Sequence, residues 1–211
     1  MDVPSVTTKH HKKFEPMTKV NSWSDVHPLT RQQWRAWLAE NYHKSEGVWF
    51  VYFKKHTGKP RFSYDEAVEE ALCFGWVDSL ARTFDDERSR LLFTPRKPKS
   101  VWSRPNKERV ARLIANGLMT DVGSTKIEAA KQDGLWDALN ASDNLEIADD
   151  LASAFRENRT AEKNFQAFTN GVKKAILQWL NSAKRAETRQ GRIKKLVAMA
   201  ANNKRVNFDK E

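Results

Sequence analysis

The sequence holds few of the residues on which small metal-binding domains depend. Its 211 residues include one cysteine, Cys73, and five histidines. A single cysteine excludes an intramolecular disulfide and a cysteine-rich metal site, and it is compatible with a reducing cytosol. The histidines form no H-x-x-x-H or H-E-x-x-H pattern. We therefore expect no metal site and no cofactor.

Patterns typical of hydrolases are also absent. The chain has no G-x-S-x-G segment and no glycine-rich phosphate loop. The acidic pairs Glu69/Glu70, Asp85/Asp86 and Asp149/Asp150 are adjacent in sequence, so the two side chains of each pair point apart on a helix or a strand. They indicate solvated surface rather than an acid/base pair.

Long hydrophobic runs are missing too. No stretch approaches the roughly 18 apolar residues of a membrane helix, and the start "MDVPSVTTKHHKKFEPM" lacks the apolar centre of a signal peptide. The sequence predicts a soluble, cytoplasmic protein without a transmembrane segment. The chain has enough apolar residues to form a hydrophobic core, because 39% of residues are hydrophobic and eight are Trp.

The net charge of +10 is unevenly distributed. Residues 82–112 hold ten basic and four acidic side chains, and residues 171–211 hold eleven basic and three acidic ones. Between them, residues 134–170 hold three basic and seven acidic side chains. Basic regions of this kind attract phosphates, nucleic acid or anionic surfaces, although a basic surface also serves solubility alone.

We expect an α+β fold, with a small antiparallel β-sheet covered by helices and followed by an all-helical C-terminal region. Residues 1–22 are polar and aperiodic, which predicts a disordered arm. The α+β domain is expected over 23–140. The helical region is expected over 141–211, packed on the first domain. Strands are predicted at 48–54, 76–84 and 89–94, from short runs rich in β-branched and aromatic residues.

The segment "SYDEAVEEALCFG" has the clearest helix signals. Ser63 and Glu66 form a capping box, and Gly75 is placed to end the helix in a left-handed conformation. Cys73 then lies in the last helical turn, where a buried and inert thiol is expected.

The strand after Gly75 carries polar side chains that the fold does not require. Trp76, Asp78 and Arg82 share one face because side chains alternate along a strand. Asp78 is the one weak catalytic candidate: as a general base it would have to be buried in a pocket with a raised pKa.

The segment "FTPRKPKSVWSRPN" combines a basic loop with the start of a helix at Ser103. Helix N-termini bind anions through free N–H groups, and Arg96 adds positive charge. The simpler interpretation is a capped helix after a basic surface loop. Trp102 is either a stacking platform or a packing residue at the helix entry.

The last predicted helix is basic and amphipathic, with Lys194 and Lys195 on its polar side. Its default partner is the acidic segment 134–170 of the same fold. The alternative is nucleic acid, which predicts strong salt dependence and a uniform weakening when Lys194 or Lys195 is neutralised.

Four segments, in this order along the chain, resemble the bacterial YdeI/OmpD-associated family, also called bacteriocin-protection proteins. They are "ALCFGWVDS", "FTPRKPKSVWSRPNKERVARLIANGLMTDVG", "EAAKQDGLW" and "AFTNGVKKAILQWLNSAKRAETRQGRIKKLV". The similarity runs from about Trp34 to Ala201, and the family motif usually has Ile where this chain has Val77.

The resemblance implies a role in tolerance of bacteriocins or cationic antimicrobial peptides and an association with an outer-membrane porin, but no catalytic mechanism and no cofactor. It also marks polar motif positions, carried over residue by residue: Asp78, Arg82, Arg96, Ser100, Ser103, Asn106, Lys184, Glu187, Thr188 and Arg189.

The leading hypothesis is a non-enzymatic stress-tolerance protein that binds an anionic ligand or a protein partner. Nucleic-acid binding and an enzyme using Asp78 are the alternatives. The expected ligand-binding residues are Trp76, Asp78, Arg82, Arg96, Trp102, Ser103, Asn106 and Arg189.

Overall fold

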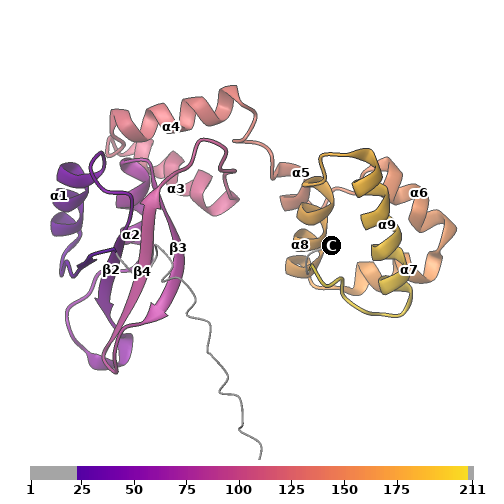
Figure 1. Cartoon of the computed structure of the whole chain (residues 1–211), viewed down its shortest axis with the longest axis horizontal. Helices are drawn as coiled ribbons and strands as arrows, with labels where there is room; N and C mark the ends of the chain where they lie inside the picture. The colour runs from indigo at the N-terminus through magenta and orange to yellow at the C-terminus, as the bar shows by residue number, and fades with distance from the viewer. Residues whose placement is uncertain (1–22, 209–211) are drawn as a thin grey trace, which may run out of the picture. The chain divides into compact units, whose positions relative to one another are not determined.

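The computed structural model describes residues 23–208, so the predicted arm at 1–22 lies outside the described residues. The α+β class is confirmed: a small sheet lies toward the N-terminus and helices make up the C-terminal region (Figure 1). Within 23–208, no helix combines the length and the apolar character needed to cross a membrane.

The sheet has four strands in the order β1-β2-β4-β3. The three predicted strands are present as β2 (Val48–Phe53), β3 (Trp76–Thr83) and β4 (Arg88–Pro95). A fourth strand, β1 (Asp25–Val26), pairs parallel to β2. The sheet is therefore mixed and not purely antiparallel as expected, because a two-residue strand is too short to leave an alternating pattern in the sequence.

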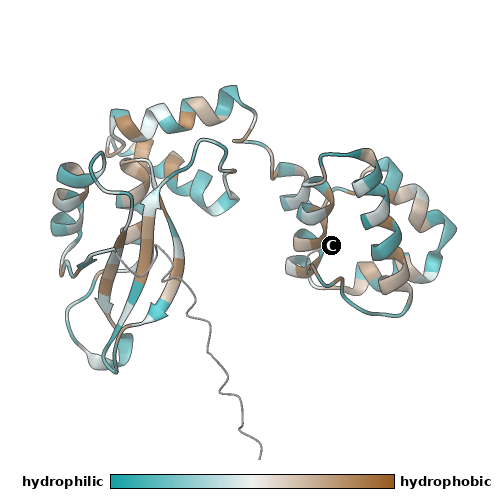
Figure 2. Cartoon of the chain, viewed as in Figure 1, coloured by the Kyte–Doolittle hydropathy of each residue, from teal (hydrophilic) through white to brown (hydrophobic). Residues whose placement is uncertain are grey.

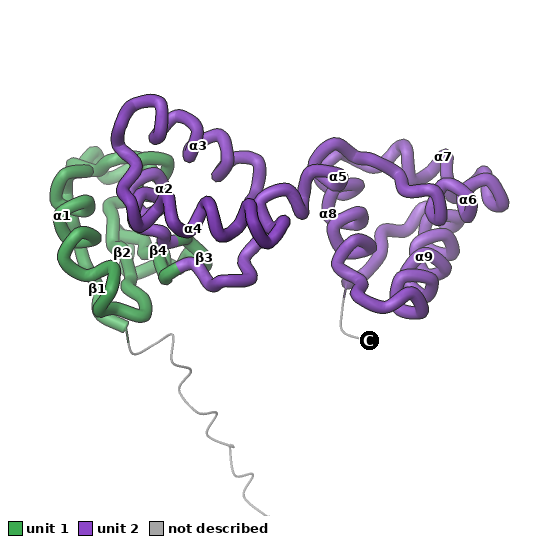
Figure 3. The backbone as a smooth tube through the Cα atoms, turned by 90° about the horizontal axis from the view of Figure 1, so that it is seen from above, with its two compact units in different colours: residues 1–68, 77–95 green, residues 69–76, 96–211 purple. Residues whose placement is uncertain are grey.

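The chain divides into two compact units, coloured separately in Figure 3. Unit 1 comprises residues up to 68 and 77–95, and unit 2 comprises 69–76 and the residues from 96 onward. The predicted boundary near residue 140, and the packing of 141–211 on 23–140, stay predictions.

Aromatic packing on the sheet holds unit 1 together. Helix α1 (Arg31–Asn41) begins after Thr30, whose hydroxyl accepts a hydrogen bond from the Gln33 N–H at 3.2 Å. The Trp34 ring contacts those of Phe50 and Phe93, with centroid separations of 5.1 and 5.3 Å. Burying such rings is the main favourable contribution of a small core.

The helix predicted from "SYDEAVEEALC" is α2 (Tyr64–Cys73), and its capping box forms. The Ser63 N–H donates to Glu66 Oε2 at 2.7 Å, and the Glu66 N–H donates to Ser63 Oγ at 3.1 Å. The hydrogen bonds from Ser63 lower the pKa of Glu66. A short 3-10 turn, η2 (Lys55–Thr57), precedes this helix. Cys73 is fully buried.

Two helices of unit 2 pack near the end of α2: α3 (Arg104–Ala115) and α4 (Asp121–Gln132). The Thr120 hydroxyl donates to the Cys73 carbonyl oxygen at the start of α4. One turn later, a Cβ on Gly123 would lie 2.5 Å from the same oxygen. Glycine at 123 therefore permits the close approach of α4 to the C-terminal end of α2.

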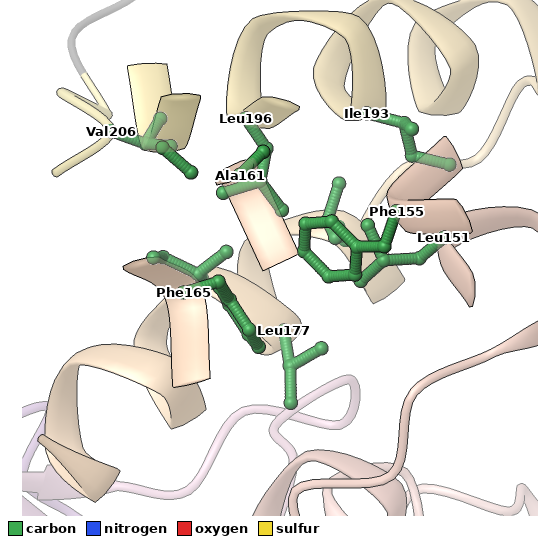
Figure 4. Packing of buried hydrophobic residues seen from close by; sticks show 11 residues of the cluster. Leu151, Phe155, Ala161, Phe165, Leu177, Ile193, Leu196 and Val206 are labelled. Atoms are coloured by element: carbon green, nitrogen blue, oxygen red, sulfur yellow. The ribbon is translucent and has the colours of Figure 1, made fainter. Parts of the chain in front are cut away.

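The C-terminal helices of unit 2 surround a separate hydrophobic cluster (Figure 4). The helices are α5 (Asn140–Asp143), α6 (Asp149–Glu157), α7 (Arg159–Ala167), α8 (Asn170–Asn181) and α9 (Ala186–Ala201). The cluster consists of Leu151, Phe155, Ala161, Phe165, Ile176, Leu177, Leu180, Ile193, Leu196, Ala200 and Val206.

Candidate functional site

The loop between β4 and α3 folds around one buried cation, Arg96. Its backbone N–H donates to the Gly75 carbonyl oxygen at 2.9 Å, which fixes where the loop starts. Its guanidinium donates through Nη1 to the Val101 carbonyl oxygen at 3.1 Å and lies 3.8 Å from the centroid of the Trp102 ring. Arg96 is only 5% exposed. These contacts offset part of the cost of burying a positive charge.

A cavity of about 100 Å³ lies between this loop and α4, and we call it the Arg96 cavity. It has room for several water molecules or for a small anion. Three of its lining side chains are cationic and one is a carboxylate. The lining residues are Arg96, Lys97, Pro98, Ser100, Trp102, Lys126, Ala129, Ala130 and Asp133.

Trp102 lines this cavity and carries a buried N–H donor. Trp102 is 1% exposed, and its ring packs against Trp136 with the centroids 5.1 Å apart. No described residue accepts a hydrogen bond from its Nε1–H. A buried polar group without a partner costs about 1–3 kcal/mol, so such groups in folded proteins call for a water, an ion or a ligand as partner.

Gly75 helps to place Lys126 at the cavity. A Cβ on Gly75 would lie 2.8 Å from Cγ of Lys126, so the lysine stem runs close over the glycine. Gly75 also has a φ of +69°, a conformation that favours glycine. The glycine of the "CFGWVDS" motif therefore ends α2 and leaves room for a lysine of α4.

Ser103 and Asn106, both predicted ligand contacts, do not line the Arg96 cavity. Ser103 occupies the N-cap position of α3 without a side-chain capping bond. The Asn106 side-chain oxygen accepts a hydrogen bond from Arg109 Nη1 at 2.9 Å. Both residues lie at the start of α3, and their described contacts are within that helix.

Arg189 does not line the cavity either, because it connects α9 to α6. Its Nε and Nη2 donate to the two carboxylate oxygens of Asp150 at 2.5 and 2.9 Å. Its Nη1 donates to Asn181 Oδ1 at 3.1 Å. The hydrogen bonds to Asp150 raise the pKa of Arg189, and the hydrogen bond from Arg189 lowers the pKa of Asp150 against the opposing effect of burial.

The Asp150–Arg189 pair predicts how the stability of the protein depends on pH. A carboxylate whose pKa is lowered on folding stabilises the fold above its ordinary pKa of 3.8, and that contribution is lost as the pH falls through the folded value. Because the pair is partly exposed, we expect a contribution below about 1 kcal/mol. Urea unfolding of wild type and Asp150→Asn between pH 6 and about pH 2 should show the larger acid loss in wild type. Equal losses in the two proteins would contradict the pair's role.

The three predicted residues of β3 have separate surroundings: Trp76 belongs to unit 2, and Asp78 and Arg82 belong to unit 1. Trp76 is buried, at 1% exposed. Asp78 is half-buried, and its Oδ2 accepts a hydrogen bond from the Tyr64 hydroxyl at 2.7 Å. The guanidinium of the exposed Arg82 lies 5.7 Å from the centroid of the Trp49 ring. The role of Asp78 as a general base stays a prediction.

Of the predicted ligand-binding residues, the structure thus brings Arg96 and Trp102 together at one cavity. Lys126 and Asp133 are the charged cavity residues that the sequence did not indicate as ligand contacts. Nothing in the local pattern of α4 distinguishes Lys126 from an ordinary surface lysine of an amphipathic helix. Over residues 23–208, no group of three or more His, Cys, Asp or Glu side chains is placed to hold a metal ion.

Two family models match the chain. Residues 26–126 match a domain of unknown function (DUF8412). Residues 144–203 match the family described as "Bacteriocin-protection, YdeI or OmpD-Associated". Neither the curated proteins nor the solved structures give a match.

The second match confirms the resemblance on the residues of the last motif block, "AFTNGVKKAILQWLNSAKRAETRQGRIKKLV". The blocks around Gly75 and Trp102 fall within the first match instead. The chain therefore carries a domain of the bacteriocin-protection, YdeI or OmpD-associated family at residues 144–203.

Proposed function

We propose that the chain is a ligand-binding protein and that the Arg96 cavity holds a small anion carrying a phosphate or carboxylate group. In this proposal binding, and not catalysis, serves the protective role that the family description names. The observation that carries the proposal is the gathering of three cations at one cavity whose lining includes Trp102, a residue with a buried and unsatisfied N–H donor.

The charges around the cavity favour an anion over a neutral ligand. Lys97 is exposed and Lys126 is half-buried, and neither forms an ion pair with a carboxylate among residues 23–208. With Arg96 they supply three positive charges against the one carboxylate of Asp133. Anionic oxygens make the strongest hydrogen bonds with such donors, so a phosphate or carboxylate group is the best-matched ligand.

The donors also differ in how firmly they are held. Arg96 is held by Val101 and by the Trp102 ring, so its position changes little on binding. Lys126 has its stem over Gly75, which restricts it more than an exposed lysine such as Lys97. Restricted donors lose less side-chain entropy when a ligand binds, so Lys126 should contribute more to affinity than Lys97.

Isothermal titration calorimetry with phosphate, sulfate and acetate tests this proposal. We expect saturable binding to wild type and about a tenfold or greater loss of affinity in Lys126→Gln, because a hydrogen bond to a charged group contributes roughly 1.5–3 kcal/mol. Lys44→Gln is the matched control, since Lys44 is exposed and lies in unit 1. Equal affinities in the two variants, or no binding of any of the three anions, would contradict the proposal.

A further inference from the structure

The acidic segment leaves most of the C-terminal positive charge without ion pairs. Arg189 pairs with Asp150, and Lys174 pairs with Asp143. Eight other cations of this region form no ion pair with any carboxylate of the described chain. They are Lys173, Lys184, Arg185, Arg192, Lys194, Lys195, Lys204 and Arg205. The default expectation, in which residues 134–170 neutralise the basic helix, therefore holds for only a minority of its charges.

Aromatic rings lie among these cations on one surface of α8 and α9. The guanidinium of Arg192 and the ammonium of Lys195 lie 5.0 and 5.9 Å from the centroid of the Trp179 ring. The ring of Phe208 meets that of Trp179 edge-on, with the centroids 5.7 Å apart. Phe208 is 46% exposed. We call these four residues the Trp179 surface.

The Trp179 surface is also partly rigid before any ligand binds. Arg192 Nη1 donates to the Trp179 carbonyl oxygen at 2.5 Å and to Ser182 Oγ at 3.0 Å. The guanidinium is thus fixed beside the indole, while Lys195 and the exposed Phe208 side chain are left to contact a partner. Cations near an exposed aromatic ring form the combination with which proteins bind single strands, through phosphate contacts and base stacking.

The packing of α9 argues against a membrane as the partner. A helix that binds a bilayer inserts an apolar face. The apolar side of α9, formed by Ile193, Leu196 and Ala200, is instead buried in the hydrophobic cluster of its own unit. Figure 2 shows hydrophilic residues on this helix alongside the hydrophobic ones.

We propose that the Trp179 surface binds single-stranded nucleic acid, stacking a base on Phe208.

Fluorescence anisotropy with a labelled oligo(dT) of about 20 nucleotides tests this proposal on the full chain. We expect binding that weakens steeply with salt, and a slope of log K against log [salt] that is smaller by about 0.7 in Lys195→Gln, because one phosphate contact is lost. Phe208→Leu keeps an apolar side chain against Trp179 but removes the ring. We expect it to weaken oligo(dT) binding about fivefold or more, since stacking on one base is lost.

Heparin and anionic vesicles separate stacking from charge alone. Heparin carries dense negative charge without bases, so Phe208→Leu should leave heparin binding unchanged if the ring stacks on a base. Lys126→Gln should leave oligo(dT) binding unchanged, which separates this proposal from the function of the Arg96 cavity. The proposal is overturned if oligo(dT) does not bind at 50 mM salt, if Phe208→Leu weakens heparin as much as oligo(dT), or if vesicles bind and oligo(dT) does not.

Discussion

Lys174→Met is expected to lower the free energy of unfolding by about 3 kcal/mol. The Asp143 side chain is 1% exposed, and Lys174 Nζ lies 2.5 Å from its Oδ1. The other cation near this carboxylate is Arg104, whose Nε is 3.9 Å from Oδ2. Removing Lys174 leaves a buried negative charge with only this more distant partner, and an uncompensated buried charge is strongly destabilising.

Urea unfolding followed by circular dichroism measures the effect, and a second substitution separates charge from packing. Asp143→Asn together with Lys174→Met removes both charges and should recover much of the lost stability. Lys173→Met is the control, because among the described residues Lys173 Nζ makes only a long 3.4 Å contact with the Gln166 carbonyl oxygen. If the double variant is as unstable as Lys174→Met alone, the Asp143–Lys174 ion pair does not explain the loss.

Gly123→Ala is expected to destabilise the fold by about 3 kcal/mol, at the upper end of the cost of overpacking. The added methyl group would lie 2.5 Å from the Cys73 carbonyl oxygen and from Met119 Sδ, and 2.8 Å from the Leu72 carbonyl oxygen. Two of these three neighbours are backbone atoms at the end of α2, which cannot turn away as a side chain can. The steric clash can therefore be removed only if α4 moves away from the end of α2.

Thermal unfolding should show a melting temperature lower by about 6–12 °C in Gly123→Ala, taking about 2–4 °C per kcal/mol for a chain of this size. Gly191→Ala is the matched control. Gly191 is also within a helix, but a Cβ there meets no atom within 4 Å. Alanine at 191 should raise stability by about 0.5–1 kcal/mol. A loss at 191 equal to that at 123 would show that the close approach is not the cause.

Local signals explain why much of the fold could be predicted from the sequence. The Ser63 and Glu66 pair satisfies backbone donors within four residues, so its effect depends on no distant part of the chain. The signal at Gly75 is also local, because a helix commonly ends at a residue with a positive φ, a conformation that favours glycine. Strand β1 escaped prediction because its two residues are ordered by pairing with β2, more than 20 residues away.

The candidate site was less predictable because its parts come from distant segments. Arg96 and Trp102 lie six residues apart in one basic loop, and the sequence indicated both. Lys126 joins them only because Gly75 and Gly123 let α4 approach the end of α2. Arg189 was expected to contact the ligand, yet its partner Asp150 lies 39 residues earlier and no local pattern connects the two.

The direct test of the central proposal is the NMR signal of the Trp102 indole N–H, assigned by its loss in Trp102→Phe. If the cavity binds an anion, this resonance should shift on titration with phosphate or acetate, saturate, and require more anion in Lys126→Gln. A Trp102 signal that stays in place while millimolar anion is added would contradict the account.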